Sequence, residues 1–108
     1  MNTSMIANNL NPLHPTHPGC ILKEELESRG ISQRQLAKDI GISYSQLNEV
    51  LNEKRAISPE LSLMFEAALG IDAEPLMNMQ TRYNLQMTRR NHSFLERLKA
   101  IHRVAVVL

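Results

Sequence analysis

The chain has 108 residues, of which 43% are hydrophobic but only 4% aromatic, which suits one domain with a core of Leu, Ile, Met and Ala and favours an all-α fold. The longest apolar run, residues 104–108, is too short to cross a bilayer, and no basic stretch leads into an apolar one near the start, so we expect a cytoplasmic protein with no membrane partner. The formal net charge is +1, but residues 1–81 carry six basic and ten acidic side chains and residues 82–108 carry six basic and one acidic, so any nucleic-acid surface must be local.

The chain is expected to begin with a leader and one helix. Residues 1–16 show no sustained hydrophobic periodicity, which is typical of a flexible leader. Pro18 suits the first position of a helix, apolar residues then repeat at helical spacing as far as Leu26, and Gly30 follows. This pattern predicts a helix over residues 18–29.

Two short capped helices are expected next. Ser32 and Ser43 each precede a glutamine by three residues, which is the spacing of a capping box at the start of a helix. The first of these helices is expected over residues 33–40, before Gly41, and the second over residues 44–52. Two such helices joined by a short connection that contains glycine are typical of a helix-turn-helix, so this segment is predicted to bind DNA.

The remainder of the chain is also expected to be helical. One helix is predicted from Pro59 to about residue 69, and a longer one from Asp72 to about Asn91. A further capping box predicts that a last helix begins at Ser93. The sequence therefore predicts helices from residue 18 almost to the end.

The helix after Ser43 has the two faces that a DNA-reading helix needs. At about 100° per residue, Leu47, Val50 and Leu51 fall on one side and polar residues on the other. Short polar side chains on such a face can meet base edges in the major groove, although the same pattern also fits an ordinary surface helix. Glu49 shares the polar face, and its carboxylate would repel phosphates unless it accepts a hydrogen bond from a cytosine amino group.

The expected DNA contacts are of two kinds, to base edges and to phosphates. The expected DNA-binding residues are Gln33, Ser43, Tyr44, Ser45, Gln46, Asn48, Asn52, Lys54 and Arg55. Those on the first turns of the second helix are candidates for base contacts, and Tyr44 can also reach a thymine methyl or a phosphate. Gln33, Asn52, Lys54 and Arg55, with backbone N–H groups at the two helix starts, are candidates for phosphate contacts.

The C-terminal part offers a candidate dimer or partner surface. Met77, Met79, Tyr83 and Met87 repeat at helical spacing, which fits either an interface or a core stripe. The basic residues of 82–103 can contact phosphate or an acidic partner, or form solvated faces. Residues 104–108 can add to the edge of a partner's sheet or pack at the chain end.

No catalytic or metal site is expected. His14, His17 and Cys20 are spaced three apart, but a structural zinc site needs four ligands and no fourth lies nearby. The single cysteine cannot form an internal disulfide and is more simply a small residue of a first helical turn. No nucleophile, base and oxyanion donors are grouped in the sequence, so we expect no enzyme activity, no cofactor and no metal.

Several motifs together resemble a known family. They are His17-Pro18-Gly19, Gly30-Ile31-Ser32-Gln33, Leu36-Ala37, Ile40-Gly41-Ile42-Ser43, Lys54-Arg55-Ala56-Ile57-Ser58-Pro59 and Ala68-Leu69-Gly70. Over about residues 17–85, the chain resembles the HigA-type antitoxins of the phage-repressor-like (Xre) helix-turn-helix family. The chain departs from that family at Cys20, where Glu is common, at Glu53, where Gly is common, and at Leu76 and Met77, which replace an aromatic pair.

The resemblance implies a fold and partners. It implies a five-helix phage-repressor-like domain, which we place over residues 17–72, with a C-terminal helical extension over residues 73–108. It also implies a homodimer that binds double-stranded operator DNA in its own promoter and neutralises a HigB-type ribonuclease toxin. Two alternatives stay open: a phage-type repressor without a toxin, and a protein-interaction module with a vestigial helix-turn-helix.

Overall fold

The computed structural model describes residues 15–104 and shows an all-α fold there, as expected. The six helices of this part of the chain are α2 (Pro18–Arg29), α3 (Gln33–Ile40), α4 (Tyr44–Leu51), α5 (Pro59–Leu69), α6 (Ala73–Arg89) and α7 (His92–Lys99). Four of them lie within residues 17–72, where a domain of five helices was expected, and α6 and α7 lie within residues 73–108, so the expected helix count of the domain is wrong. Most of the expected leader and the last four residues lie outside the described range.

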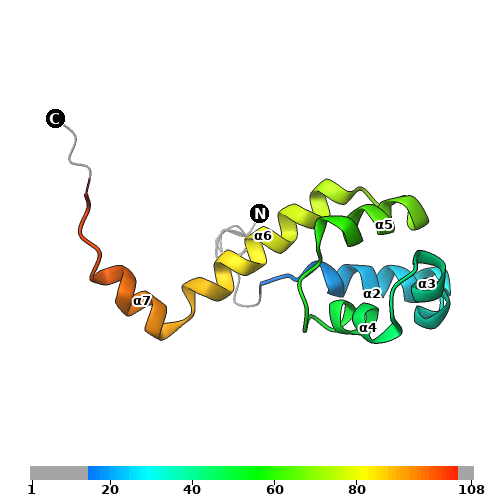
Figure 1. Cartoon of the computed structure of the whole chain (residues 1–108), viewed down its shortest axis with the longest axis horizontal. Helices are drawn as coiled ribbons and strands as arrows, with labels where there is room; N and C mark the ends of the chain where they lie inside the picture. Colours follow the sequence, from blue (N-terminus) through cyan, green and yellow to red (C-terminus); the bar gives the residue numbers. More distant parts are fainter. Residues whose placement is uncertain (1–14, 105–108) are drawn as a thin grey trace, which may run out of the picture.

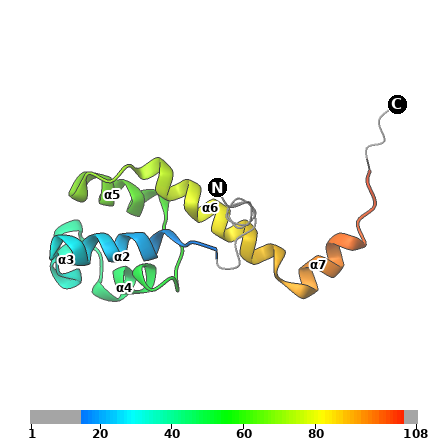
Figure 2. The ribbon, with the colours of Figure 1, turned by 180° about the vertical axis from the view of Figure 1, so that it is seen from behind.

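The first four of these helices and the start of α6 enclose one core. Helix α5 packs against α6, and α2 packs against both α4 and α6. The buried side chains are mainly leucines, with Phe65 fully buried among them. Helix α6 then continues away from this body and α7 follows it beyond its far end, as both Figure 1 and Figure 2 show.

The predicted serine caps form at the starts of α3 and α4. The Ser32 Oγ accepts a hydrogen bond from the Gln35 backbone N–H, and the Ser43 Oγ accepts one from Gln46. The reciprocal half of the first capping box is replaced, because the Gln35 side chain donates to Asp39 instead. These caps satisfy backbone donors that the first turn of a helix leaves without partners.

The predicted start of the last helix is wrong by two residues. The N-cap of α7 is Asn91, whose side chain accepts from the Phe94 backbone N–H, and Ser93 lies inside the helix. Asn91 is free to cap because α6 ends at Arg89 and leaves it in an extended conformation. Asparagine is at least as good an N-cap as serine, so the upstream residue starts the helix.

A close contact between α2 and α4 requires glycine at position 19. A Cβ atom added to Gly19 would lie 1.9 Å from the backbone oxygen of Val50, which is far inside van der Waals contact. The absence of a side chain therefore lets the first turn of α2 touch the backbone of α4. This contact helps to set where α4 lies on the body of the protein.

His17 holds the same corner together. Its side chain is buried, and its Nδ1 accepts a hydrogen bond from the Gly19 backbone N–H at 2.9 Å. Its ring lies edge-on to the ring of Tyr83 in α6, with 4.9 Å between the two ring centroids. Burial lowers the pKa of His17 from 6.5, and the Glu53 carboxylate and a hydrogen bond with the Arg55 backbone oppose that shift. His17 thus joins the start of α2, the loop after α4 and α6.

Two side-chain acceptors dock α6 on the domain. The Gln80 Oε1 accepts from the buried Ile57 backbone N–H at 2.9 Å. The Glu66 Oε1 accepts from the Ala73 backbone N–H at 2.9 Å, while Asp72 makes no side-chain cap. The first half of α6 is therefore tied to the loop after α4 as well as to α5.

Candidate nucleic-acid interface

The helix-turn-helix has the geometry predicted for it. Gly41 ends α3 in the left-handed conformation at φ 80°, and α4 begins three residues later. Leu47, Val50 and Leu51 are buried, as expected for the apolar face of α4. The polar face of α4 is therefore the side turned away from the core.

The polar residues of α4 differ in how far they are exposed. Ser45 and Tyr44 are exposed, whereas Gln46, Asn48 and Glu49 are half-buried. The exposed residues of this face, Tyr44 and Ser45, are therefore accessible to a partner.

A hydrogen-bonded network links α3 to α4 on this side. The Asn48 Nδ2 donates to the Gln33 Oε1 at 3.2 Å and to the Tyr44 hydroxyl at 3.4 Å. The Arg34 guanidinium lies over the Tyr44 ring at 4.2 Å from the ring centroid, a cation–π geometry. Two expected base-contact residues and one expected phosphate-contact residue thus lie side by side, with a cation beside them.

The end of α4 and the loop after it carry further cations. The Lys23 Nζ donates to the Asn52 Oδ1 at 3.0 Å, and the Asn52 Nδ2 donates to the Asn48 carbonyl at 2.9 Å. Arg55 forms an ion pair with Glu49, with its Nη2 2.6 Å from the Glu49 Oε1. Lys54 is exposed. Every expected phosphate-contact side chain therefore lies beside α4 or at the start of α3.

Glu53 in this loop is held in a conformation that glycine prefers. Its φ is 66°, and it is the one described non-glycine residue with positive φ. The departure from the family's common glycine therefore falls at a position where a side chain costs free energy.

Two residues near this surface were not among the expected contacts. Arg34 and Lys23 lie against Tyr44 and Asn52 respectively. Lys23 is 29 residues away from its partner in sequence, so no helical periodicity could have joined the two. Arg34 directly follows the expected contact residue Gln33, and this adjacency in the sequence could have indicated that Arg34 lies near the surface.

The four candidate interface residues of α6 differ in how far they are buried. Met77 packs against the core, Tyr83 contacts His17, and Met79 is half-buried. Met87 is 45% exposed, because α6 has left the domain by that turn. The stripe therefore runs from core to surface along one helix.

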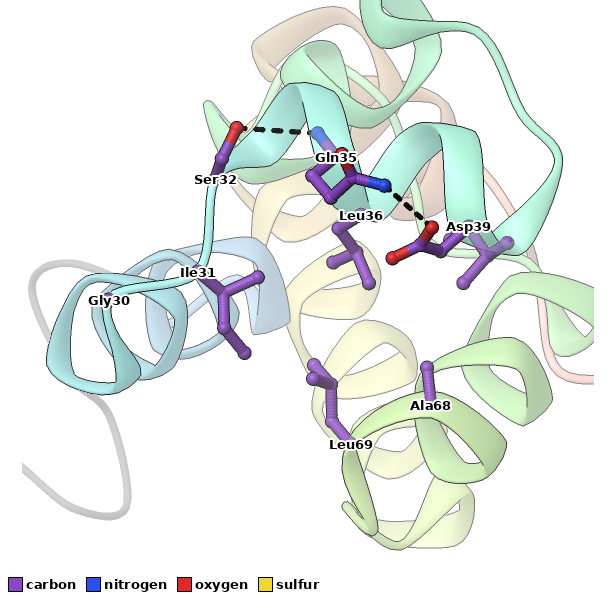
Figure 3. Close-up of a pocket in the computed structure, with 9 residues that line it drawn as sticks. Gly30, Ile31, Ser32, Gln35, Leu36, Asp39, Ala68 and Leu69 are labelled. Atoms are coloured by element: carbon purple, nitrogen blue, oxygen red, sulfur yellow. Dashed lines mark hydrogen bonds between the residues drawn. The ribbon is translucent and has the colours of Figure 1, made fainter.

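A groove of about 720 Å³ lies between α3 and the C-terminal end of α5. Figure 3 shows Ile31, Leu36 and Leu69 around it, with the Gln35–Asp39 hydrogen bond at its edge. Asp39 is the one titratable side chain that lines it. Ser32, which also lines the groove, caps α3 through its Oγ, and no α4 residue lines it.

The His14, His17 and Cys20 spacing has a structural explanation in part. The Nδ1 of His17 accepts from a backbone N–H, and Cys20 is exposed with a free thiol, while His14 lies outside the described residues. Residues 15–104 contain no group of three or more His, Cys, Asp or Glu placed to hold a metal ion. Within the same range, none of the helices has both the length and the apolar character needed to cross a membrane.

Comparison with known proteins agrees with this geometry. A helix-turn-helix family model matches residues 22–76. Virulence-associated protein I of Dichelobacter nodosus is 39% identical over 82 residues, which are 75% of this chain and 76% of that protein. The family match covers both helices of the candidate interface and the core beneath them.

Two solved structures are similar over nearly their whole length. An addiction module antidote protein of the HigA family from Coxiella burnetii is 30% identical, with a TM-score of 0.72 over 84% of this chain and 99% of that chain. The antitoxin HigA of Pseudomonas aeruginosa, solved with the higBA promoter, is 27% identical, with a TM-score of 0.74 over 85% of this chain and 100% of that chain. The chain therefore belongs to the helix-turn-helix family, among the HigA-type antitoxins of its Xre group.

Proposed function

We propose that this protein is a sequence-specific DNA-binding antitoxin that represses its own operon and neutralises a HigB-type ribonuclease toxin. The observation that carries the proposal is the open polar face of α4, set above a fully buried apolar face and flanked by cations. A helix of this kind can enter the major groove while its neighbours hold the phosphates. The similarity to an antitoxin solved with promoter DNA supports it.

The proposed base contacts come from the first two turns of α4. Ser45 is exposed and can donate or accept, Gln46 can make a bidentate contact to adenine, and Asn48, whose Nδ2 donates to Gln33 and Tyr44, keeps its Oδ1 to accept from a base amino group. Because Asn48 is bonded to Gln33 and Tyr44, these residues approach the groove as one preorganised unit. Such preorganisation reduces the side-chain entropy that binding costs.

The proposed phosphate contacts surround this unit. Gln33 at the start of α3, the capped N-terminus of α4 at Ser43, and Asn52, Lys54 and Arg55 after α4 would fix the register on the duplex. These contacts give affinity without sequence choice. If each half-site neutralises about three to five phosphates, log affinity should fall with log salt by about 0.9 per phosphate.

We further propose that the protein binds as a homodimer through α6 and α7. Met87, Leu85 and Leu98 are large apolar side chains left 45%, 49% and 42% exposed where these helices leave the domain. Exposed apolar surface of this kind is typical of an interface. Paired α4 helices would then enter successive major grooves about 34 Å apart.

A gel-shift titration on the DNA upstream of the gene tests the proposal. The full chain should bind that DNA much more tightly than random DNA of the same length, and the product of the neighbouring gene should co-purify with it and lose ribonuclease activity. Binding without a neighbouring toxin would favour the phage-type repressor instead. Equal binding to both DNAs would contradict sequence-specific recognition.

A further inference from the structure

Glu49 occupies a position on α4 where a carboxylate needs a special reason. It lies four residues after Ser45, hence on the same exposed face one turn along the helix. It is the one acidic residue of α4, and that face is the one proposed to enter DNA. A bare carboxylate there would be repelled by the phosphates on both sides of the groove.

Arg55 removes most of that repulsion. Its Nε donates to the Glu49 Oε1 at 2.8 Å, and its Nη2 lies 2.6 Å from the same oxygen. The pair is neutral overall and about half exposed, so it can approach DNA without a net negative charge. Both bonds fall on Oε1, which leaves Oε2 to accept from another donor.

The hydrogen-bonding groups of the major groove limit which base can donate to the Glu49 Oε2. A carboxylate only accepts hydrogen bonds. Guanine and thymine present acceptors in the groove, and adenine places its N7 acceptor beside its amino group, whereas cytosine presents its N4 amino donor alone. An acceptor-only side chain therefore suits cytosine best.

We propose that Glu49 is a specificity-determining residue that reads a cytosine of the operator through Oε2, while Arg55 holds it in place through Oε1. This inference rests on the proposed DNA binding and adds the base that one side chain recognises. Arg55 acts as a positioning residue for Glu49 and keeps its outer N–H groups for a phosphate.

The test compares base preferences of the wild-type protein and two variants of the full chain. Each C·G pair of the upstream site is changed singly to T·A, which replaces the cytosine amino donor by an acceptor. At one C·G pair in each half-site, the pair that Glu49 contacts, this change should weaken wild-type binding by about 5- to 150-fold. For Glu49→Ala the same change should have less than about a twofold effect, with preferences at all other pairs unchanged.

Glu49→Gln guards against a purely electrostatic explanation. Glutamine keeps the shape of glutamate but can also donate to thymine, so its preference for cytosine at that pair should fall while it still binds. If both variants bind every sequence more tightly by the same factor, with unchanged base preferences, Glu49 only repels phosphate and the inference is overturned.

Two controls separate the possible failures. Glu27→Ala removes an equal charge from an exposed site on α2 and should leave every base preference as in the wild type. A changed preference in this control would show that net charge sets the preference and would also overturn the inference. If the wild-type protein binds upstream and random DNA equally, the proposed function itself fails.

Discussion

Replacement of Gly19 by alanine tests the packing that positions α4. The added Cβ would lie 1.9 Å from the Val50 backbone oxygen, and its partner is backbone that cannot rotate aside as a side chain could. The two helices would have to separate by about 1 Å, and overpacking of this kind costs about 1–3 kcal/mol. Alanine returns roughly 0.5–1 kcal/mol through its better helix propensity.

We therefore expect Gly19→Ala to lower the free energy of unfolding by about 1 kcal/mol, which is about 4–8 °C in Tm for a domain of this size. Urea and thermal unfolding, both followed by circular dichroism, measure the change. Cys20→Ala alters the neighbouring exposed residue and should unfold as the wild type does. A Gly19→Ala protein within about 0.5 kcal/mol of the wild type would refute the close contact between α2 and α4.

Three further changes test the loop after α4 and its supports. Glu53→Gly should raise the free energy of unfolding by about 1 kcal/mol in urea titrations, because glycine relieves the positive φ; a less stable variant would contradict this. Gln80→Leu keeps the side-chain volume but leaves the buried Ile57 N–H without its acceptor, so we expect the free energy of unfolding to fall by about 1–3 kcal/mol. An unchanged free energy of unfolding would show that only the packing of this side chain matters. Because burial lowers the pKa of His17, the unfolded chain takes up the proton first, and stability should be full above pH 6.5 and fall as the pH drops from there toward the lower pKa of the folded state. His17→Asn should lose this part of the decline between pH 7.5 and 5, and an identical decline in both proteins would show that His17 does not cause it.

Local patterns in the sequence predicted the helices well because their determinants are local. The bounds 18–29 and 33–40 are those of α2 and α3, since a proline, a serine cap and two glycines punctuate them. The predicted start of α7 was wrong because Asn91 caps this helix two residues before Ser93. Asn91 can do so because α6 ends at Arg89, and the capping pattern at Ser93 does not show where α6 ends.

The candidate interface was predictable in its face but not in its connections. Helical periodicity placed the polar side of α4 away from the core, which its buried apolar side confirms. The contacts of His17 with Tyr83, Gly19 with Val50 and Lys23 with Asn52 join residues 29 or more positions apart. Periodicity describes one helix at a time, so these contacts required the folded structure.

The ratio of operator to random-DNA affinity tests most directly whether the polar side of α4 selects a DNA sequence. We predict that Gln46→Ala loses about 1–3 kcal/mol on the upstream DNA and almost nothing on random DNA, whereas Lys54→Ala weakens both. Equal losses on the two DNAs for Gln46→Ala would contradict base reading by α4.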